Sequence, residues 1–124
     1  MKEIFKQEGY NLIGAAMEVY NQLGSGFLEE IYQECLEIEL KLRGIVYESK
    51  PKLTIFYKKN KLNKYYQPDL YVYNGIIVEL KAIKHLGDNE IAQILNYLKG
   101  SEKRVGYLIN YGCPTELEWK RFIL

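Results

Sequence analysis

The 124-residue sequence is poor in several residue types, and each shortage narrows the range of possible functions. The two cysteines, Cys35 and Cys113, lack the close spacing of metal-binding cysteine pairs, so we expect free thiols in a reducing compartment. The one histidine, His85, lies in a predicted loop and lacks an obvious carboxylate or cysteine partner in sequence. A site built on histidine or cysteine is therefore not expected.

Long apolar runs are also missing. No stretch approaches the roughly 20 apolar residues that a membrane-spanning helix needs, and Met1-Lys2-Glu3 leads into a charged, amphipathic segment rather than an apolar signal region. We therefore expect a cytoplasmic protein without a membrane partner. The length and the 48% apolar content favour one domain, residues 1–124, with its own core.

One acidic residue and one lysine interrupt the most apolar part of the chain. Residues 76–81 form a β-branched run typical of a buried strand, except for Glu79 and Lys81. Because side chains alternate along a strand, Ile77, Glu79 and Lys81 share one face. Burial of charged groups is costly unless they are paired or bind a metal, so this face indicates a functional site.

Asp69 is expected to lie beside these residues. Asn74-Gly75, between the run that begins at Asp69 and the run that contains Glu79, is a strong signal for a tight hairpin. Folding there places Asp69 opposite Glu79 or Lys81. Two carboxylates with open coordination positions suit Mg²⁺, which could activate water for phosphodiester cleavage. The alternative is a surface hairpin in which Glu79 and Lys81 form a solvated ion pair.

Three more motifs make the chain resemble a known family. Gly26, Glu29 and Tyr32 have the spacing of the GxxExxY proteins, a group within the PD-(D/E)XK nuclease superfamily. Pro68-Asp69 and Glu79-Leu80-Lys81 resemble the signature of that superfamily, and the segment from Gln93 to Tyr97 resembles the QxxxY element of its RecB-like branch.

This resemblance implies an active site and a cofactor. The implied catalytic residues are Glu29, Asp69, Glu79, Lys81 and Gln93, with Mg²⁺ or Mn²⁺ bound by Asp69, Glu79 and Glu29. Each also has a structural interpretation: a carboxylate such as Glu29 is favoured at a helix start whatever its function, and Gln93 could be a solvated residue at the edge of a helix.

Positive charge is concentrated in one segment although the net charge is only +1. Residues 48–66 contain six lysines and one glutamate, and tyrosines lie between them. This segment could bind phosphates and stack on bases, or it could be an edge hairpin that its lysines protect from aggregation. The candidate nucleic-acid-binding residues are Lys50, Lys52, Lys58, Lys59, Lys61, Lys64, Tyr32 and Tyr97.

The pattern of elements predicts an α/β fold. We expect helices at 2–23, 27–43, 88–99 and 115–123, and strands at 46–57, 62–73, 76–82 and 104–110. This order corresponds to the restriction-endonuclease-like core, αβββαβ, with a central mixed four-stranded sheet and one extra helix at each end. The expected function is metal-dependent cleavage of nucleic acid, with DNA as the substrate that the resemblance implies. The alternative is a catalytically degenerate module that binds nucleic acid or protein. The 12 tyrosines make a homodimer plausible.

Overall fold

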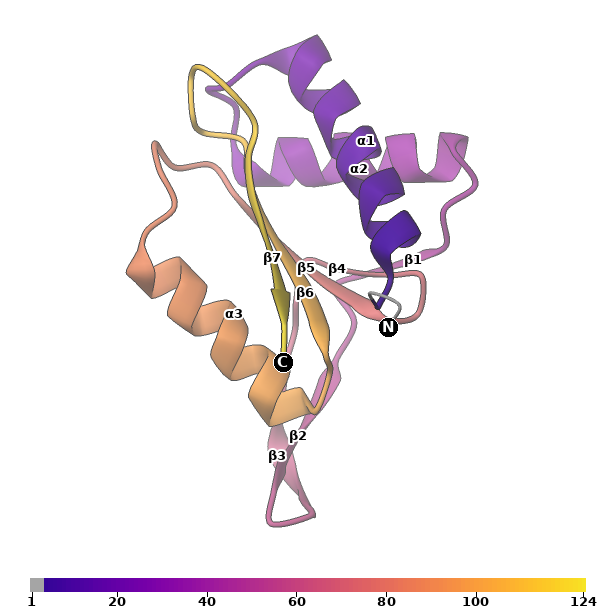
Figure 1. The fold of residues 1–124 in the computed structure, drawn as a ribbon, viewed down its shortest axis with the longest axis vertical. Coiled ribbons are helices and arrows are strands. Elements are labelled where there is room, and N and C mark those ends of the chain that lie inside the picture. Colours follow the sequence, from indigo (N-terminus) through magenta and orange to yellow (C-terminus); the bar gives the residue numbers. More distant parts are fainter. Residues whose placement is uncertain (1–3) are drawn as a thin grey trace.

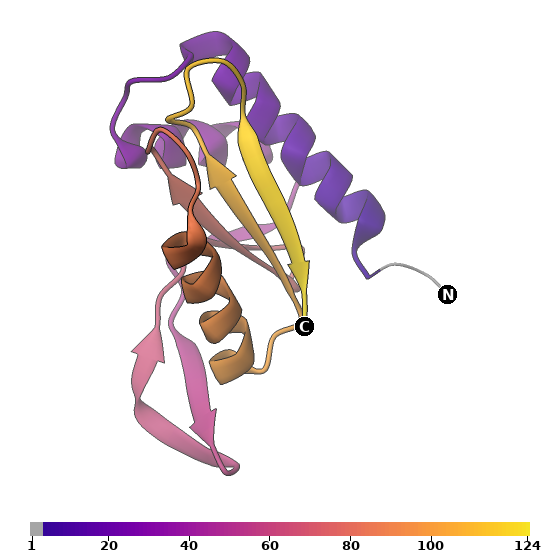
Figure 2. The ribbon, with the colours of Figure 1, turned by 60° about the vertical axis from the view of Figure 1, so that its left-hand side comes forward.

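A computed structural model describes residues 4–124, which form a mixed sheet with helices on both faces and a projecting hairpin (Figures 1 and 2). The sheet order is β1-β4-β5-β6-β7, in which β5 and β6 are parallel and the other neighbours are antiparallel. The elements are α1 (Lys6–Leu23), α2 (Glu29–Leu42), β1 (Tyr47–Ser49), β2 (Leu53–Tyr57), β3 (Asn60–Tyr66), β4 (Leu70–Val72), β5 (Ile76–Lys81), α3 (Asp88–Ser101), β6 (Val105–Asn110) and β7 (Glu118–Ile123). The predicted α/β class, with a mixed sheet flanked by helices, is confirmed.

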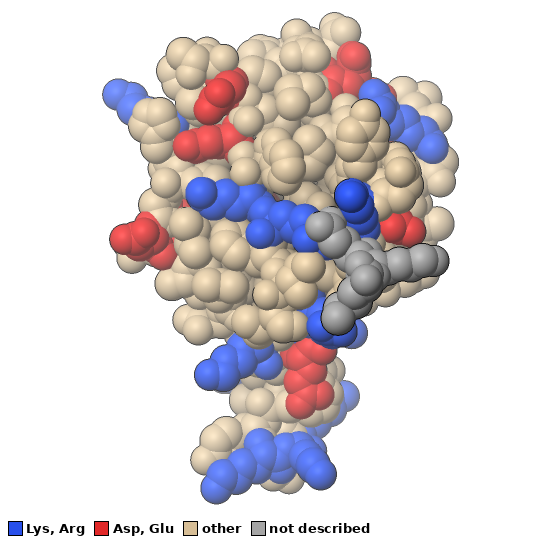
Figure 3. All heavy atoms as spheres, viewed as in Figure 1, with Lys and Arg blue, Asp and Glu red and all other residues tan. Residues whose placement is uncertain are grey.

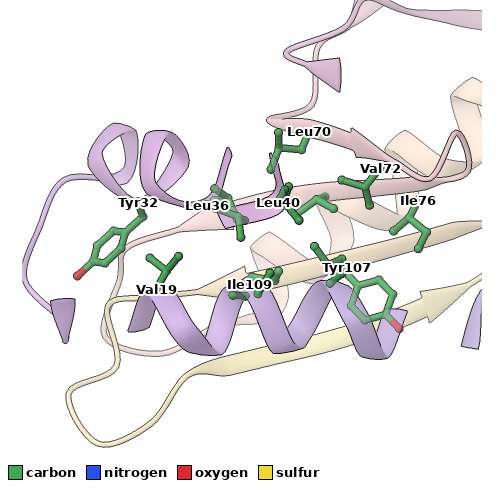
Figure 4. Packing of buried hydrophobic residues seen from close by; sticks show 14 of the residues in the cluster. Val19, Tyr32, Leu36, Leu40, Leu70, Val72, Ile76, Tyr107 and Ile109 are labelled. Carbon is green, nitrogen blue, oxygen red and sulfur yellow. The ribbon is translucent and has the colours of Figure 1, made fainter. Parts of the chain in front are cut away.

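Helices α1 and α2 cover one face of the sheet. The α1 helix buries Leu12, Ala16 and Val19 at helical spacing, and α2 buries Leu36 and Leu40 in the same way. These side chains meet alternate residues of the central strands, namely Ile76, Val78, Leu80, Tyr107 and Ile109 (Figure 4). The apolar spacing of the sequence therefore fixes which face of β5 turns towards α1 and α2.

Helix α3 and the base of the β2–β3 hairpin cover the opposite face. Ile77 of β5 packs there with Leu53, Tyr66 and Leu98. Gly106 of β6 allows α3 to approach closely, because a Cβ atom at that position would lie only 3.1 Å from Leu98. Glu79 and Lys81 lie on the same face of β5 as Ile77, as the alternation predicts.

The turn between β4 and β5 sets the register of these two strands. Tyr73 and Asn74 both have positive φ, and the Gly75 N–H donates to the Val72 carbonyl over 3.1 Å, as in a type I′ turn. The turn is thus centred on Tyr73–Asn74, one residue earlier than predicted. A side chain at Gly75 would displace the Phe5 ring, since a Cβ there would lie 2.0 Å from that ring.

The chain's last segment contradicts the sequence prediction. Residues 115–123 were expected to form a helix, but Glu118–Ile123 forms β7, so the sheet has five strands rather than four. Trp119 pairs with Ile109 and Arg121 with Tyr107, while Phe122 packs towards α3. This alternation of faces suits pairing with the edge of β6, and tertiary pairing overrides the local helical pattern.

The two long strands predicted before β5 are each divided in the structure. The first gives β1 and β2, and the second gives β3 and β4. Strands β2 and β3 pair only with each other and project beyond the sheet (Figures 1 and 2). The expected helix at 88–99 continues through Gly100 to Ser101. The expected N-terminal helix begins at Lys6, and its predicted residues 2 and 3 lie outside the described part of the chain.

Asn110 joins the loop after β5 to strands β6 and β7. Its fully buried amide donates to the Ile83 carbonyl and to Glu118, while its oxygen accepts from the N–H groups of Ile83 and Gly112. Buried polar groups left without partners are costly. This network therefore holds the segment that directly follows Lys81.

We expect Asn110→Ala to lower the free energy of unfolding by about 2–4 kcal/mol, because several main-chain partners lose their hydrogen bonds. Chemical denaturation measures this change. The matched control is Asn96→Ala, since Asn96 is exposed on α3 and its loss should alter stability by less than about 0.5 kcal/mol. Equal effects of the two substitutions would contradict the role assigned to Asn110.

Candidate metal-dependent active site

Asp69 and Glu79 lie side by side and are tied to each other through the main chain. The pairing of Leu70 with Val78 places Asp69 opposite Glu79, as predicted. The Asp69 N–H donates to Glu79 Oε1 over 3.1 Å, and the Leu80 N–H donates to Asp69 Oδ2 over 2.7 Å. Neither carboxylate can therefore reorient without loss of a main-chain hydrogen bond.

Each carboxylate keeps one oxygen without a partner among residues 4–124. Glu79 Oε1 also accepts from the Tyr66 hydroxyl over 2.6 Å, so this oxygen has two donors. Within residues 4–124, no hydrogen bond or ion pair involves Glu79 Oε2 or Asp69 Oδ1. The arrangement fixes the orientation of both carboxylates and leaves an open oxygen on each.

Glu29, the first residue of α2, borders the same site. It lines a cavity of about 460 Å³ together with Asp69, Lys50, Gln33 and Ala82. Helix α2 begins there because the preceding Leu28 is extended, and carboxylates are favoured in the first turn of a helix. The helix start therefore carries an acidic group to the cavity.

Two lysines act on these carboxylates through their charge. Lys81, at the end of β5, counteracts the increase in pKa at Glu29, Asp69 and Glu79, and Lys50 does the same for Asp69. Among residues 4–124, neither lysine lies within ion-pair distance of a carboxylate. Both ammonium groups thus remain available to a further ligand near the site.

The three acidic side chains all have raised pKa values. Burial, followed by the negative charge of Asp69, raises the pKa of Glu79 to about 7. Burial is also the largest cause at Asp69, where the Leu80 N–H opposes it. At Glu29 burial raises the pKa, Lys81 lowers it and Asp69 raises it. Because these groups resist ionisation together, binding of a cation would relieve their repulsion.

The donor set fits a hard divalent cation held by two carboxylates. Mg²⁺ prefers oxygen ligands and usually binds one or two carboxylates, waters and substrate phosphate oxygens. Asp69 and Glu79 offer the two open oxygens. No cluster of three His, Cys, Asp or Glu side chains in the described part of the chain could hold a metal, so Glu29 does not complete a ready three-carboxylate site.

Gln93 and Tyr97 connect to Glu79 through another tyrosine, Tyr66. Gln93 Nε2 donates to the Tyr97 hydroxyl over 2.8 Å, and the Tyr97 ring stacks on Tyr66 with centroids 3.4 Å apart. Tyr66 then donates to Glu79. Gln93 is exposed and does not line the cavity with Asp69. It therefore borders the site from outside the cavity.

The projecting hairpin carries most of the predicted basic residues. Lys and Arg side chains gather on it at the bottom of the view in Figure 3. Lys52 lies over the ring of Tyr65, and Lys58 over the ring of Tyr57, at 5.0 and 5.6 Å from the centroids. Lys50 differs from these residues because it lines the cavity with Asp69. The hairpin thus presents cations beside half-exposed aromatic rings.

Tyr32, predicted as a nucleic-acid-binding residue, is instead part of the core. It is fully buried, it stacks on Tyr111 with ring centroids 4.4 Å apart, and its hydroxyl donates to the Gly24 carbonyl. Its position one turn after Glu29 places it under the helix rather than at the cavity. The prediction was wrong because a tyrosine at helical spacing fits a core position equally well.

Two residues of the site were missed from the sequence. Gln33 is buried and donates to the Asp69 carbonyl over 2.7 Å, which anchors the site to α2. Its spacing of four residues from Glu29 was the available signal. Tyr66 is one of the tyrosines of the lysine-rich segment, and no motif in the sequence distinguishes it. Its contact with Glu79 depends on the path of the hairpin, which sequence spacing does not reveal.

The fold and the paired carboxylates define a restriction-endonuclease-like protein with an acidic site at the end of a central strand. The sequence pattern of the PD-(D/E)XK nuclease superfamily matches residues 6–122, so this chain belongs to that superfamily. Such proteins are usually nucleases and generally use divalent metals such as Mg²⁺. A comparison with curated proteins gives no match.

A solved structure supports the fold. The crystal structure of SSO0001 is similar to this chain with a TM-score of 0.58 and 16% sequence identity. The similarity covers 96% of this chain and 59% of SSO0001, so the present chain spans little more than half of that protein. Among the described residues, no helix is long and apolar enough to span a membrane.

Proposed function

We propose that this protein is a metal-dependent nuclease that hydrolyses phosphodiester bonds in DNA. The observation that carries the proposal is the locked pair of Asp69 and Glu79, which leaves one open oxygen on each residue beside Glu29 and Lys81. Burial and mutual repulsion disfavour ionisation of both carboxylates, and a bound divalent cation would offset this cost. Superfamily membership supports the choice of reaction.

Several residues of the chain would each have a distinct role in hydrolysis. Asp69 and Glu79 would hold Mg²⁺ or Mn²⁺, which when bound lowers the pKa of water and stabilises charge on the phosphate. Lys81 would orient or deprotonate the attacking water, or neutralise the phosphate, and Glu29 would bind the water shell. Water adds to phosphorus, one phosphorus–oxygen bond breaks, and the leaving oxygen gains a proton. Gln93 would support this geometry through Tyr97.

The hairpin lysines would hold the substrate. Lysines bind phosphates, and aromatic rings can stack on unpaired bases. Lys52, Lys58, Lys59, Lys61 and Lys64 are all exposed, as are Tyr57 and Tyr65. Tyr97 would contribute from the edge of α3. This arrangement supports a strand that lies along the hairpin and enters the site past Lys50.

The proposal also covers the subfamily, the domain boundaries, the oligomeric state and the location of the protein. Glu29 at the cavity and Tyr32 beneath it are consistent with a GxxExxY protein, and the position of Gln93 and Tyr97 near Glu79 is consistent with a RecB-like branch. We propose one nuclease-like domain over residues 1–124, acting as a homodimer through its exposed tyrosines. Free Cys35 and Cys113 support a cytoplasmic location.

The direct test is cleavage of labelled single-stranded, duplex and branched DNA, and of RNA, with Mg²⁺, Mn²⁺ or EDTA. We expect cutting of DNA that requires the metal, and a loss of about a hundredfold or more in Lys81→Met, because a cation beside the reacting phosphate is removed. Lys84→Met, three residues further along and exposed, is the matched control. Absence of cutting on every substrate would favour a module that only binds.

Substitution of the two lysines at the hairpin turn tests the proposed binding surface. Lys58→Ala with Lys59→Ala should weaken nucleic-acid binding about equally for all sequences, and it should reduce the slope of log affinity against log salt by about 1–2, because phosphate contacts are lost. Fluorescence anisotropy at several salt concentrations measures both effects. Lys41→Ala, on the far part of α2, should change neither. An unchanged salt slope would place the substrate elsewhere.

A further inference from the structure

The hairpin that carries the lysines is joined to the main sheet only through its base. Strands β2 and β3 form a separate two-stranded sheet, and such hairpins are marginally stable alone. Leu53 and Tyr66, which pair with each other at the base, are buried, whereas the residues from Phe56 to Tyr65 are exposed. The position of the hairpin therefore depends on Leu53 and Tyr66, together with Ile55 of β2, which packs against the same cluster beside α3.

Tyr66 makes two contacts that lead to different parts of the site. Its ring stacks on Tyr97 of α3, which fixes the ring plane, and its hydroxyl donates to Glu79 Oε1. The Asp69 N–H donates to the same oxygen. Loss of the Tyr66 bond would leave the Asp69 N–H as the one remaining donor on that oxygen. Rotation of the carboxylate would then cost one hydrogen bond instead of two, so the direction of Oε2 would be less fixed.

We propose that Tyr66 is a positioning residue that couples the hairpin to the metal site. A nucleic-acid strand bound to the hairpin lysines favours the hairpin position in which Tyr66 holds Glu79. In that position Glu79 directs Oε2 towards the cation, so the strand and the cation strengthen each other's binding. This inference rests on the proposed function, and it adds a residue and a linkage between two binding events.

The coupling has a defined physical basis. A ligand shifts an equilibrium only by its different affinity for the two states, which here are the hairpin positions with and without the Tyr66–Glu79 bond. With the Tyr66–Glu79 bond formed, the hairpin lysines would contact a nucleic-acid strand that runs towards the acidic site. Without that bond, the hairpin would move and these contacts would be lost. Because linkage is reciprocal, a cation at Glu79 should also tighten binding of the strand.

The test is a double-mutant cycle read out as Mn²⁺ affinity rather than as cleavage. Calorimetric titrations with Mn²⁺ use the wild type, Tyr66→Phe, Lys58→Ala/Lys59→Ala, and the combined variant, with and without a saturating phosphorothioate DNA oligonucleotide that resists cutting. Tyr66→Phe keeps the ring on Tyr97 and removes only the hydroxyl. Tyr10→Phe, which removes the hydroxyl of an exposed tyrosine on α1, is the matched control.

With the oligonucleotide bound, we expect the two lysine substitutions to weaken Mn²⁺ binding about five- to tenfold when Tyr66 is present. In the Tyr66→Phe protein, the same substitutions should weaken Mn²⁺ binding by less than about twofold. Without the oligonucleotide, they should change Mn²⁺ affinity in neither background. Effects that multiply independently would overturn the coupling while leaving the nuclease proposal intact. Failure of the wild type to bind Mn²⁺ or the oligonucleotide would refute the proposed function, and the coupling with it.

Discussion

Replacement of Glu79 with glutamine is expected to lower metal-dependent cleavage by about a thousandfold or more without unfolding the protein. Glutamine has nearly the same volume, and its oxygen can still accept from the Asp69 N–H and the Tyr66 hydroxyl. It lacks the negative charge that a divalent cation requires. The loss should therefore appear in metal affinity and in the rate of cutting, and not in the fold.

Single-turnover cleavage at saturating Mn²⁺, with calorimetry for metal binding, measures these changes. Glu48→Gln removes the same charge from an exposed position on β1 and serves as the control. It should cut DNA within about twofold of the wild-type rate, since its carboxylate lies outside the site. Cutting by Glu79→Gln at the wild-type rate would remove Glu79 from the metal site.

The stability of the metal-free protein should fall as the pH rises from about 5 to 8. Burial and Asp69 raise the pKa of Glu79 from 4.5 to about 7. The folded state then binds the proton more tightly than the unfolded state. The resulting stabilisation is complete below about 4.5 and is lost as the pH rises through about 7, with a size of about 2–3 kcal/mol.

Chemical denaturation between pH 5 and pH 8 in EDTA tests this dependence. Glu79→Gln should show a smaller decrease in stability, although Asp69 and Glu29, whose pKa values are also raised, will keep part of it. Mn²⁺ at 100 times its dissociation constant should restore about 2.7 kcal/mol at pH 8. A wild-type protein that becomes more stable with rising pH would contradict the raised pKa of Glu79.

The pairing of the two acidic residues could be predicted because both signals are local. Alternation along β5 gives the face of Glu79, and the turn signal gives the strand opposite it. The assignment of Glu29 to the candidate site followed from the family resemblance rather than from spacing. In contrast, β7 has a sequence that is compatible with a helix, and only the free edge of β6 makes it a strand.

Contacts between distant segments account for the other errors. Tyr66 reaches Glu79 only because β3 ends at Tyr66 and β4 begins at Leu70, so that the hairpin turns away from the sheet. Gln33 reaches Asp69 only because α2 packs against the sheet at β5 and β1. Tyr32 has the same spacing from Glu29 that a ligand-binding residue could have, yet it faces Tyr111 in the core. Sequence patterns predict which face of a helix or strand a residue occupies, but they do not predict which distant residue it contacts.

The three-residue turn between β4 and β5 limits how this protein can vary during evolution. The turn contributes no side chain to the acidic site, and Tyr73 and Asn74 can be exchanged for other residues that accept positive φ. Its length has no such freedom. One inserted or deleted residue would shift Asp69 by one position along β5 and turn the strand's side chains to the opposite face. Homologues that retain this chemistry should therefore differ in the composition of the turn while sharing its length.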